Sequence, residues 1–331
     1  MDDAIVTRDR PNGPTPRRVL VLGGTGTIGR ATVRALVSRG HAVVCLVRRP
    51  APLPAGATAR VADVTDPAAL ARDGIRGETF DVLVSCLASR TGLPDDAWAI
   101  DYQAQLNALE AAQAAGVTQV VLLSAICVQK PVLAFQHAKL AFEQALIGSG
   151  LAYTIVRPTA FFKSLSGQID RVRRGKPFLV FGDGLLTACK PISDDDLGQY
   201  LADCIDDDAR RNRVLPIGGP GAAITPRAQG EHLFALLGRE PRFRHVPVAL
   251  LDAIIAVLAT LGRWVPALAA KAELARIGRY YATESMLVLD PATGRYDAQA
   301  TPSTGSETLF AYYGRLVRGE AVAERGDHAV F

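Results

Sequence analysis

The chain has 331 residues, of which 49% are hydrophobic and 21% charged, and its formal net charge is +4 at pH 7. This length and composition exclude a disordered chain and predict a large buried core, in one domain or in a domain with a subsidiary lobe. Acidic and basic residues are well mixed, which argues against a nucleic-acid partner. The five cysteines form no Cys-x-x-Cys or Cys/His cluster, so we expect reduced, mostly buried thiols and no metal site.

The first segment, residues 1–16, combines charged side chains with several prolines. It lacks the apolar stretch of a signal peptide, so we expect a disordered leader and a cytoplasmic protein.

Residues 18–30 read RVLVLGGTGTIGR, a short apolar strand that leads through a glycine-rich turn into a helix. Gly23 permits the tight turn, Gly26 lets the backbone approach a pyrophosphate, and Gly29 lets the helix pack closely on the sheet. The free N–H groups at the start of the helix attract the phosphates. The alternative is an ordinary glycine-rich turn without a ligand. The pattern predicts a dinucleotide site whose cofactor-binding residues are Gly23, Thr25, Gly26, Thr27, Ile28 and Gly29.

Apolar runs of five to seven residues then alternate with helices of roughly a dozen residues. This alternation is typical of βαβ units in a parallel sheet, so we expect an α/β fold with a Rossmann-type doubly wound parallel sheet. The expected strands are 42–47, 59–62, 81–87, 119–124 and 152–157, and the expected helices are 28–39, 99–115 and 135–147.

The second half is less regular, with a strand at 178–181 and a helix at 197–205. We expect an NADP-binding domain over residues 17–200 and a smaller, mostly helical substrate-binding lobe over 201–331, with 159–190 also contributing to the substrate site. The strongly apolar segment 246–268 is too interrupted to span a membrane and is expected to form a core helix pair. A patch that contacts a membrane surface or a pigment is the alternative.

The second strand ends on Arg48 and Arg49, where the adenosine ribose of a dinucleotide lies. An acidic residue there would accept hydrogen bonds from the ribose of NAD, whereas a guanidinium pairs with the 2′-phosphate of NADP. The pattern therefore favours NADPH, with two solvated arginines as the alternative. Asp63 and Val64 follow the third strand and are expected either to line the adenine or to form a helix-capping turn.

Ser124 ends the fifth strand, and Lys139 follows on the next helix. Here the chain resembles the short-chain dehydrogenase/reductase superfamily, which places a serine at this strand end and a Tyr-x-x-x-Lys on this helix. The resemblance implies that Lys139 is the catalytic lysine that holds the nicotinamide ribose, and that Ser124 and Pro158 line the cofactor site. The tyrosine position is occupied by Phe135, which has no proton to donate, so the chain resembles the atypical branch of the superfamily.

Several segments resemble the divinyl chlorophyllide a 8-vinyl-reductase family: FQHAKL at 135–140, YTIVRPTAFFKS at 153–164, CKPIS at 189–193 and ERGDHAVF at 324–331. The resemblance implies NADPH-dependent reduction of the 8-vinyl group of divinyl chlorophyllide or protochlorophyllide, in chlorophyll or bacteriochlorophyll biosynthesis. The ring of such a magnesium tetrapyrrole spreads negative charge, so no tyrosine is needed, and the proton comes from Lys139 or from solvent. The implied substrate-binding residues are Phe135, Phe161, Phe162 and Lys163. The alternatives are core packing for one of the two rings Phe161 and Phe162, and a solvated position for Lys163.

Three other functions stay open: an NADP-binding redox sensor of the NmrA-like type, a structural dinucleotide-binding subunit of a larger complex, and an isoflavone-reductase-like enzyme that reduces another double bond. An amphiphilic pigment also implies peripheral contact with the photosynthetic membrane. The sequence does not determine the oligomeric state.

Overall fold

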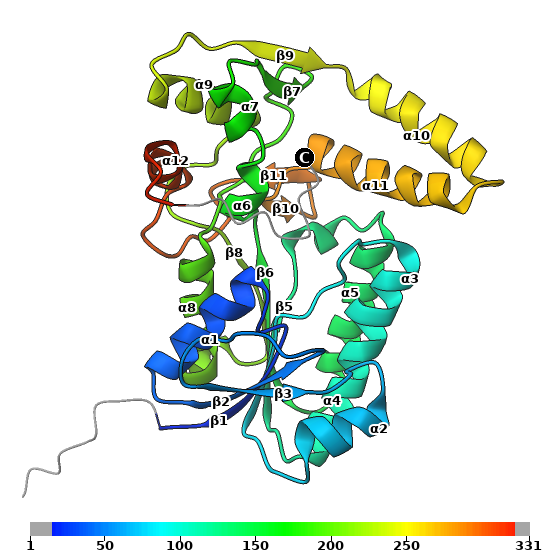
Figure 1. Ribbon diagram of the computed structural model, residues 1–331, viewed down its shortest axis with the longest axis vertical. Coiled ribbons are helices and arrows are strands. Elements are labelled where there is room, and N and C mark those ends of the chain that lie inside the picture. The colour runs from blue at the N-terminus through cyan, green and yellow to red at the C-terminus, as the bar shows by residue number, and fades with distance from the viewer. Residues whose placement is uncertain (1–14, 322–331) are drawn as a thin grey trace, which may run out of the picture.

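The computed structural model describes residues 15–321. The predicted leader, apart from residues 15 and 16, and the segment 324–331 therefore lie outside the described residues. The described chain forms a parallel sheet covered by helices on both faces, with a lobe above one edge of the sheet (Figure 1).

The central sheet has seven strands in the order β3-β2-β1-β4-β5-β6-β8, and every neighbouring pair is parallel. The predicted doubly wound sheet is therefore confirmed. The order reverses between β1 and β4, which is the point where open sheets of this kind bind their ligands. The strands are β1 (Arg18–Leu22), β2 (Ala42–Val47), β3 (Ala57–Val61), β4 (Val82–Ser85), β5 (Gln119–Leu123), β6 (Ala152–Pro158) and β8 (Arg213–Ile217).

Two helices cover one face of the sheet, α1 (Thr27–Ser38) and α8 (Asp194–Asp206). They pack very closely, because a Cβ on Gly198 of α8 would lie only 2.6 Å from the carbonyl carbon of Ala31 in α1. The opposite face carries α2 (Pro67–Ala69), α3 (Pro94–Ala97), α4 (Gln105–Ala114) and α5 (Ala134–Ile147) (Figure 1). Both interfaces are apolar, so the sheet is buried between two hydrophobic layers.

The helix predicted over 99–115 is not α-helical throughout. Residues Trp98–Ala104 form a π-helical stretch before α4 begins, and a second π-helical stretch, Leu70–Ile75, follows α2. Insertions of this kind are frequent at functional sites. Within residues 15–321, two short 3-10 turns complete the helical connections, at Ile126–Gln129 and at Asp208–Arg210.

The lobe is built from several separate segments of the chain. It contains a two-stranded parallel sheet of β7 (Phe178–Phe181) and β9 (Phe243–Val246) and an antiparallel pair of β10 (Val288–Asp290) and β11 (Arg295–Asp297). Its helices are α6 (Phe162–Leu165), α7 (Ile169–Arg173), α9 (Pro226–Leu236), α10 (Val248–Gly262), α11 (Pro266–Thr283) and α12 (Leu309–Arg318). The boundary predicted at residue 200 falls inside α8, and β8 returns the chain to the central sheet beyond it.

The apolar segment 246–268 does form two helices, but the prediction that they belong to the core is wrong. No residue of α10 is buried, and α10 and α11 project from the body as an antiparallel hairpin (Figure 1). Hydrophobicity alone cannot distinguish a core helix from an exposed apolar one. Among residues 15–321, no helix is both long enough and apolar enough to cross a membrane.

All five cysteines are free thiols. Four are buried and Cys86 is half-buried, as expected from their apolar surroundings. Burial raises the pKa of Cys45 to about 12, so this thiol stays protonated and inert.

Candidate dinucleotide and substrate site

The glycine loop between β1 and α1 has the geometry of a phosphate cradle. Gly23 has a φ of +70°, and a Cβ there would lie 2.4 Å from the carbonyl oxygen of Cys86. A Cβ on Gly29 would lie 2.0 Å from the carbonyl oxygen of Gly23, so the turn and the helix can approach each other only without side chains. Gly26 precedes α1 and supplies no side-chain cap, and the first turn of α1 holds no acidic residue. The first N–H groups of α1 therefore remain available to an anion, and the loop fits a dinucleotide pyrophosphate.

The side chains of the loop have different environments. Thr25 is exposed, whereas Ile28 is buried in the core between α1 and the sheet, so Ile28 can offer a ligand only its backbone. Lys163, which the resemblance implies as a substrate residue, reaches from α6 to the loop, where its Nζ donates to Oγ1 of Thr27 over 2.6 Å. The structure thus places Lys163 beside the start of α1, where its charge adds to the positive field of the helix N-terminus.

Arg48 and Arg49 follow β2 directly and are exposed. Neither forms a hydrogen bond or an ion pair with another residue of the described range, so both guanidinium groups are available. Because β1 and β2 are neighbouring parallel strands, the arginines after β2 and the glycine loop after β1 lie at the same end of the sheet. An adenosine 2′-phosphate is expected to lie in this region.

Asp63 and Val64 form a turn after β3. The Asp63 carboxylate accepts hydrogen bonds from the backbone N–H of Thr65 at 2.9 Å and from its hydroxyl at 2.7 Å, and these bonds hold the pKa of Asp63 below its usual value. Val64 is buried, and its carbonyl oxygen accepts from Nδ2 of Asn107 at 3.1 Å. The turn is thus fixed by its own hydrogen bonds, while Asp63 remains exposed at the edge of the candidate adenine site.

Lys139 is held by a carboxylate that the sequence analysis did not identify. Its Nζ lies 2.9 Å from Oδ1 of Asp101, in a pair whose side chains are 13% and 0% exposed. Asp101 belongs to the π-helical stretch before α4, and its Oδ1 also accepts from the backbone N–H of Ser89 at 3.3 Å. Its other oxygen, Oδ2, is buried without a hydrogen-bond partner among the described residues. A buried acceptor of this kind favours a hydrogen-bond donor from a ligand or from water.

Nothing in the sequence separates Asp101 from the other acidic residues on helices. Asp101 and Lys139 lie 38 positions apart, on two elements that meet only when the sheet forms.

Ser124 does not point into a free cavity. Its hydroxyl donates to Oε1 of Glu143 over 2.5 Å, and Glu143 is paired in turn with the guanidinium group of Arg157, whose Nε lies 3.1 Å from the same oxygen. Glu143 is fully buried, so the pair fixes the ends of β5 and β6 relative to α5. The Ser124 hydroxyl is therefore part of a structural network, and its expected contact with the cofactor stays a prediction.

Phe135 lies on α5 four residues before Lys139 and is half-buried. It packs against an apolar cluster that joins the sheet unit to α11, including Cys127, Ile277 and Tyr280. The Tyr280 hydroxyl donates to the carbonyl oxygen of Cys127 at 2.9 Å. Burial raises the pKa of both Tyr280 and Cys127, so neither is ionised near neutral pH. The wall beside Lys139 is accordingly aromatic, apolar and uncharged.

Phe161 and Phe162 have different roles. Phe162 is buried in the core of the lobe, where its ring lies 5.4 Å from that of Tyr312, so it cannot stack on a substrate. Its assignment as a substrate residue is corrected accordingly. Phe161 is half-buried and packs where α6 meets the sheet unit, and it remains a candidate. Pro158 is buried at the end of β6.

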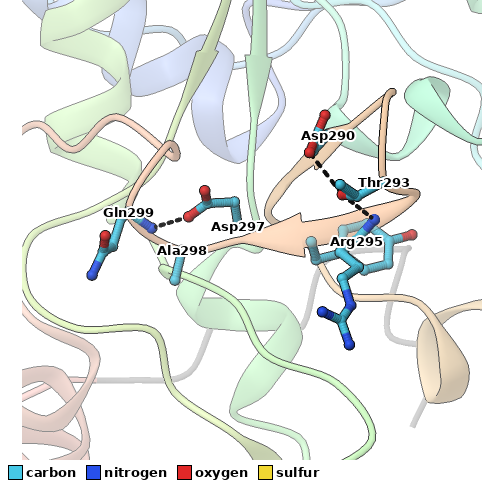
Figure 2. A pocket seen from close by; sticks show the side chains of 7 residues that line it. Asp290, Thr293, Arg295, Asp297, Ala298 and Gln299 are labelled. Atoms are coloured by element: carbon cyan, nitrogen blue, oxygen red, sulfur yellow. Dashed lines mark hydrogen bonds between the residues drawn. The ribbon is translucent and has the colours of Figure 1, made fainter.

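A hollow of about 420 Å³ lies at the β10–β11 hairpin, and none of the site residues discussed above lines it. Figure 2 shows the side chains around it. Its acidic side chains already accept hydrogen bonds within their own turns: Asp290 from Thr293 at 2.7 Å, and Asp297 from the backbone of Gln299 at 2.7 Å. No residue of the glycine loop lines this hollow, so it is not the dinucleotide site.

Comparison with known proteins agrees with this geometry. A family model described as NAD(P)H-binding matches residues 23–208. The chloroplastic divinyl chlorophyllide a 8-vinyl-reductase of Oryza sativa subsp. indica is 50% identical over 97% of this chain and 84% of the rice protein. The protein of the same name from Zea mays is 50% identical over 95% of this chain and 82% of the maize protein.

Among solved structures, an NADPH-dependent quinone oxidoreductase of Escherichia coli in complex with NADPH matches with a TM-score of 0.65 and 19% identity, over 90% of this chain and 99% of that one. At this identity the match establishes the fold alone. The match extends over nearly the whole quinone oxidoreductase.

Proposed function

Because the chain belongs to the divinyl chlorophyllide a 8-vinyl-reductase family, we propose that it reduces the 8-vinyl group of divinyl chlorophyllide or protochlorophyllide to an ethyl group with NADPH. The observation that carries the proposal is the 50% identity over 97% of the chain, which includes the lobe as well as the sheet. The protein is accordingly an NADPH-dependent oxidoreductase that acts on a carbon–carbon double bond in chlorophyll or bacteriochlorophyll biosynthesis. The redox sensor, the structural subunit and the isoflavone-reductase-like enzyme are not favoured.

The residues of the site support this chemistry. When bound, NADPH supplies the hydride that adds to the vinyl group, and a proton completes the ethyl group. The glycine loop and Lys163 hold the phosphates, and Arg48 and Arg49 bind the 2′-phosphate. Lys139 binds the nicotinamide ribose, and Asp101 positions the Lys139 ammonium through their 2.9 Å contact.

Phe135 suits a substrate that is a flat conjugated ring. No alkoxide forms when a vinyl group is reduced, so the site does not need the acidic tyrosine of a carbonyl reductase. The half-buried rings of Phe135 and Phe161 provide apolar surface against which a macrocycle can pack. The apolar wall beside Lys139 also excludes water from the reacting carbon atoms.

The direct test is to incubate the purified protein with NADPH and divinyl chlorophyllide and to follow both pigment and NADPH by absorption. We expect one NADPH to be oxidised for each vinyl group reduced. Lys139→Met should abolish most of the activity, whereas Lys176→Met, which removes an exposed cation elsewhere, should retain it. A protein that binds NADPH but leaves the pigment unchanged would instead be a sensor or a structural subunit.

We also propose peripheral contact with the photosynthetic membrane, because a tetrapyrrole with an apolar ring and an ionised propionate concentrates at membrane surfaces. The relatives from rice and maize are chloroplastic by name.

A further inference from the structure

The hairpin of α10 and α11 carries an apolar surface that the proposed reaction does not use. One side of α10 packs on α11, where a Cβ on Gly262 would lie 2.8 Å from the Cα of Ala269. The opposite side is exposed. Its large side chains recur every three or four residues and so form a single stripe along the helix, made of Leu250, Ile254, Val257 and Leu261.

The stripe continues onto the tip of the hairpin. Trp264 is 85% exposed, and Val265 beside it is exposed as well. A tryptophan has an apolar body and one polar N–H group, so it is favoured at the boundary between lipid and water. We call Leu250, Ile254, Val257, Leu261, Trp264 and Val265 together the hairpin face.

The charges around the hairpin face are unbalanced. The two acidic residues of the hairpin are already paired, Asp252 with Arg279 and Glu273 with Arg276. Arg263 and Lys271 are exposed beside the tip, and neither forms an ion pair within residues 15–321. The unpaired charge of the hairpin is therefore positive.

We propose that the hairpin face docks on the surface of an anionic lipid bilayer, with its apolar side chains at the acyl boundary and with Arg263 and Lys271 against the head groups. An exposed apolar stripe with an interfacial tryptophan and flanking cations matches such a surface. A second copy of the chain fits less well, because it would bring the same unpaired cations together. In the proposed docking, the hairpin lies along the bilayer surface.

The docked hairpin would connect the membrane to the reaction site. α11 runs from the tip to the apolar cluster beside Phe135, where Ile277 and Tyr280 contact the wall of the site. This consequence rests on the proposed function, because it concerns an amphiphilic substrate that arrives from the bilayer. The docking itself does not rest on it and can be measured without pigment or NADPH.

The test is flotation of the full chain with vesicles of phosphatidylcholine alone or mixed with phosphatidylglycerol. We expect binding to the mixed vesicles and much weaker binding to phosphatidylcholine. Leu261→Ser with Trp264→Ser should lower the partition coefficient at least tenfold, because two apolar side chains no longer enter the lipid interface. Arg263→Gln with Lys271→Gln should lower it by roughly 30-fold on anionic vesicles, the equivalent of about 1 kcal/mol per cation.

Matched controls change exposed residues elsewhere. Leu185→Ser removes another exposed apolar side chain, and Arg213→Gln with Lys176→Gln removes two other exposed cations. Both should bind vesicles as the unmodified chain does. Circular dichroism and thermal unfolding show whether each variant is folded.

Vesicle binding that the hairpin variants leave unchanged would overturn the proposal. So would a dimer in sedimentation that these variants dissociate, because the face would then be a contact between copies. Loss of reduction with intact vesicle binding would count against the proposed function alone.

Discussion

At the scale of single residues, the site depends on buried charge pairs rather than on a serine–tyrosine pair. Lys139 is paired with Asp101, and Ser124 is paired with the Glu143–Arg157 network. Phe135 packs on an apolar cluster, and a buried carboxylate fixes the position of Lys139, the lysine that we propose binds the cofactor. A buried pair is costly to disrupt, because removal of one partner leaves the other charged and desolvated.

Asp101→Asn tests whether this carboxylate positions Lys139. Asparagine has almost the same shape but no charge, so Lys139 should move from the ribose site. We expect kcat to fall by about tenfold or more, with a smaller rise in KM for NADPH. Steady-state kinetics and NADPH titration separate the two effects. Asp95→Asn, at an exposed aspartate of α3, is the control. Unchanged kcat in a folded Asp101→Asn enzyme would show that the pair serves stability only.

Arg48 and Arg49 are predicted to select NADPH. Each can form a charge-assisted hydrogen bond with the 2′-phosphate, which NADH lacks. The double variant Arg48→Ala, Arg49→Ala should raise KM for NADPH at least about tenfold and leave KM for NADH almost unchanged. Kinetics with both cofactors measure the ratio. Equal use of NADPH and NADH by the unmodified enzyme would contradict the assignment.

At the scale of elements, close backbone contacts at glycines hold the nucleotide-binding half together. Gly29 brings α1 against the loop, and Gly198 brings α8 against α1. Side-chain volume at either position would separate layers whose spacing sets the direction of the first N–H groups of α1. The glycines at these two positions thus determine how closely α1 packs on the loop and on α8.

Gly198→Ala should weaken the α1–α8 contact. The new Cβ would lie 2.6 Å from backbone carbon and 2.8 Å from backbone nitrogen, and backbone cannot move as a flexible side chain can. We expect a loss of about 1–3 kcal/mol in the free energy of unfolding, as for other overpacked sites. Urea denaturation measures it. Gly148→Ala is the matched control, because its Cβ would meet nothing closer than 3.4 Å, and it should be nearly neutral.

His41 makes the junction of α1 and β2 sensitive to pH. Burial lowers its pKa below the usual 6.5, although Asp206 opposes the shift. The folded state thus favours the neutral ring, and below about pH 6.5 the unfolded chain binds the proton more readily. The free energy of unfolding should therefore fall as pH decreases from about 7.5 to about 5.5.

Urea denaturation at several pH values in this range should show that the free energy of unfolding depends less steeply on pH for His41→Gln than for the unmodified chain. The pKa of His232 is lowered by burial in the same direction, so His232→Gln serves as the second arm. If neither substitution changes how the free energy of unfolding varies with pH, other titratable groups cause the pH dependence.

At the scale of the whole molecule, the chain passes between the sheet unit and the lobe more than once. The lobe core joins Phe162, Val180, Phe234 and Tyr313, which come from four separate elements, while β8 lies between them in sequence and belongs to the sheet. The two units meet at the site, where Lys163 of α6 donates to Thr27 of α1. The lobe therefore contributes a charge directly to the cofactor loop.

Lys163→Met tests this connection. Methionine keeps most of the length but loses the charge, so we expect the Kd for NADPH to rise by about tenfold. Thr27→Val removes the other partner, and a double-mutant cycle measures their coupling, because residues in contact are not additive. Isothermal titration of NADPH provides the values. A fully additive cycle would mean that the two residues bind the cofactor independently.

The sequence by itself determined the sheet unit and the glycine-rich turn, because these features depend on patterns within a few neighbouring residues. The role of the arginines after β2 stays a prediction. Alternating apolar runs specify βαβ units, and glycine is required where no Cβ fits. The tertiary structure decided that Asp101 meets Lys139, that Lys163 reaches Thr27, and that Phe162 is buried while Phe161 is not. Such contacts join elements far apart in the chain, and no local pattern encodes them. The tertiary structure also decided that α10 is exposed. An apolar helix has the same composition whether it packs in the protein core or lies on the surface.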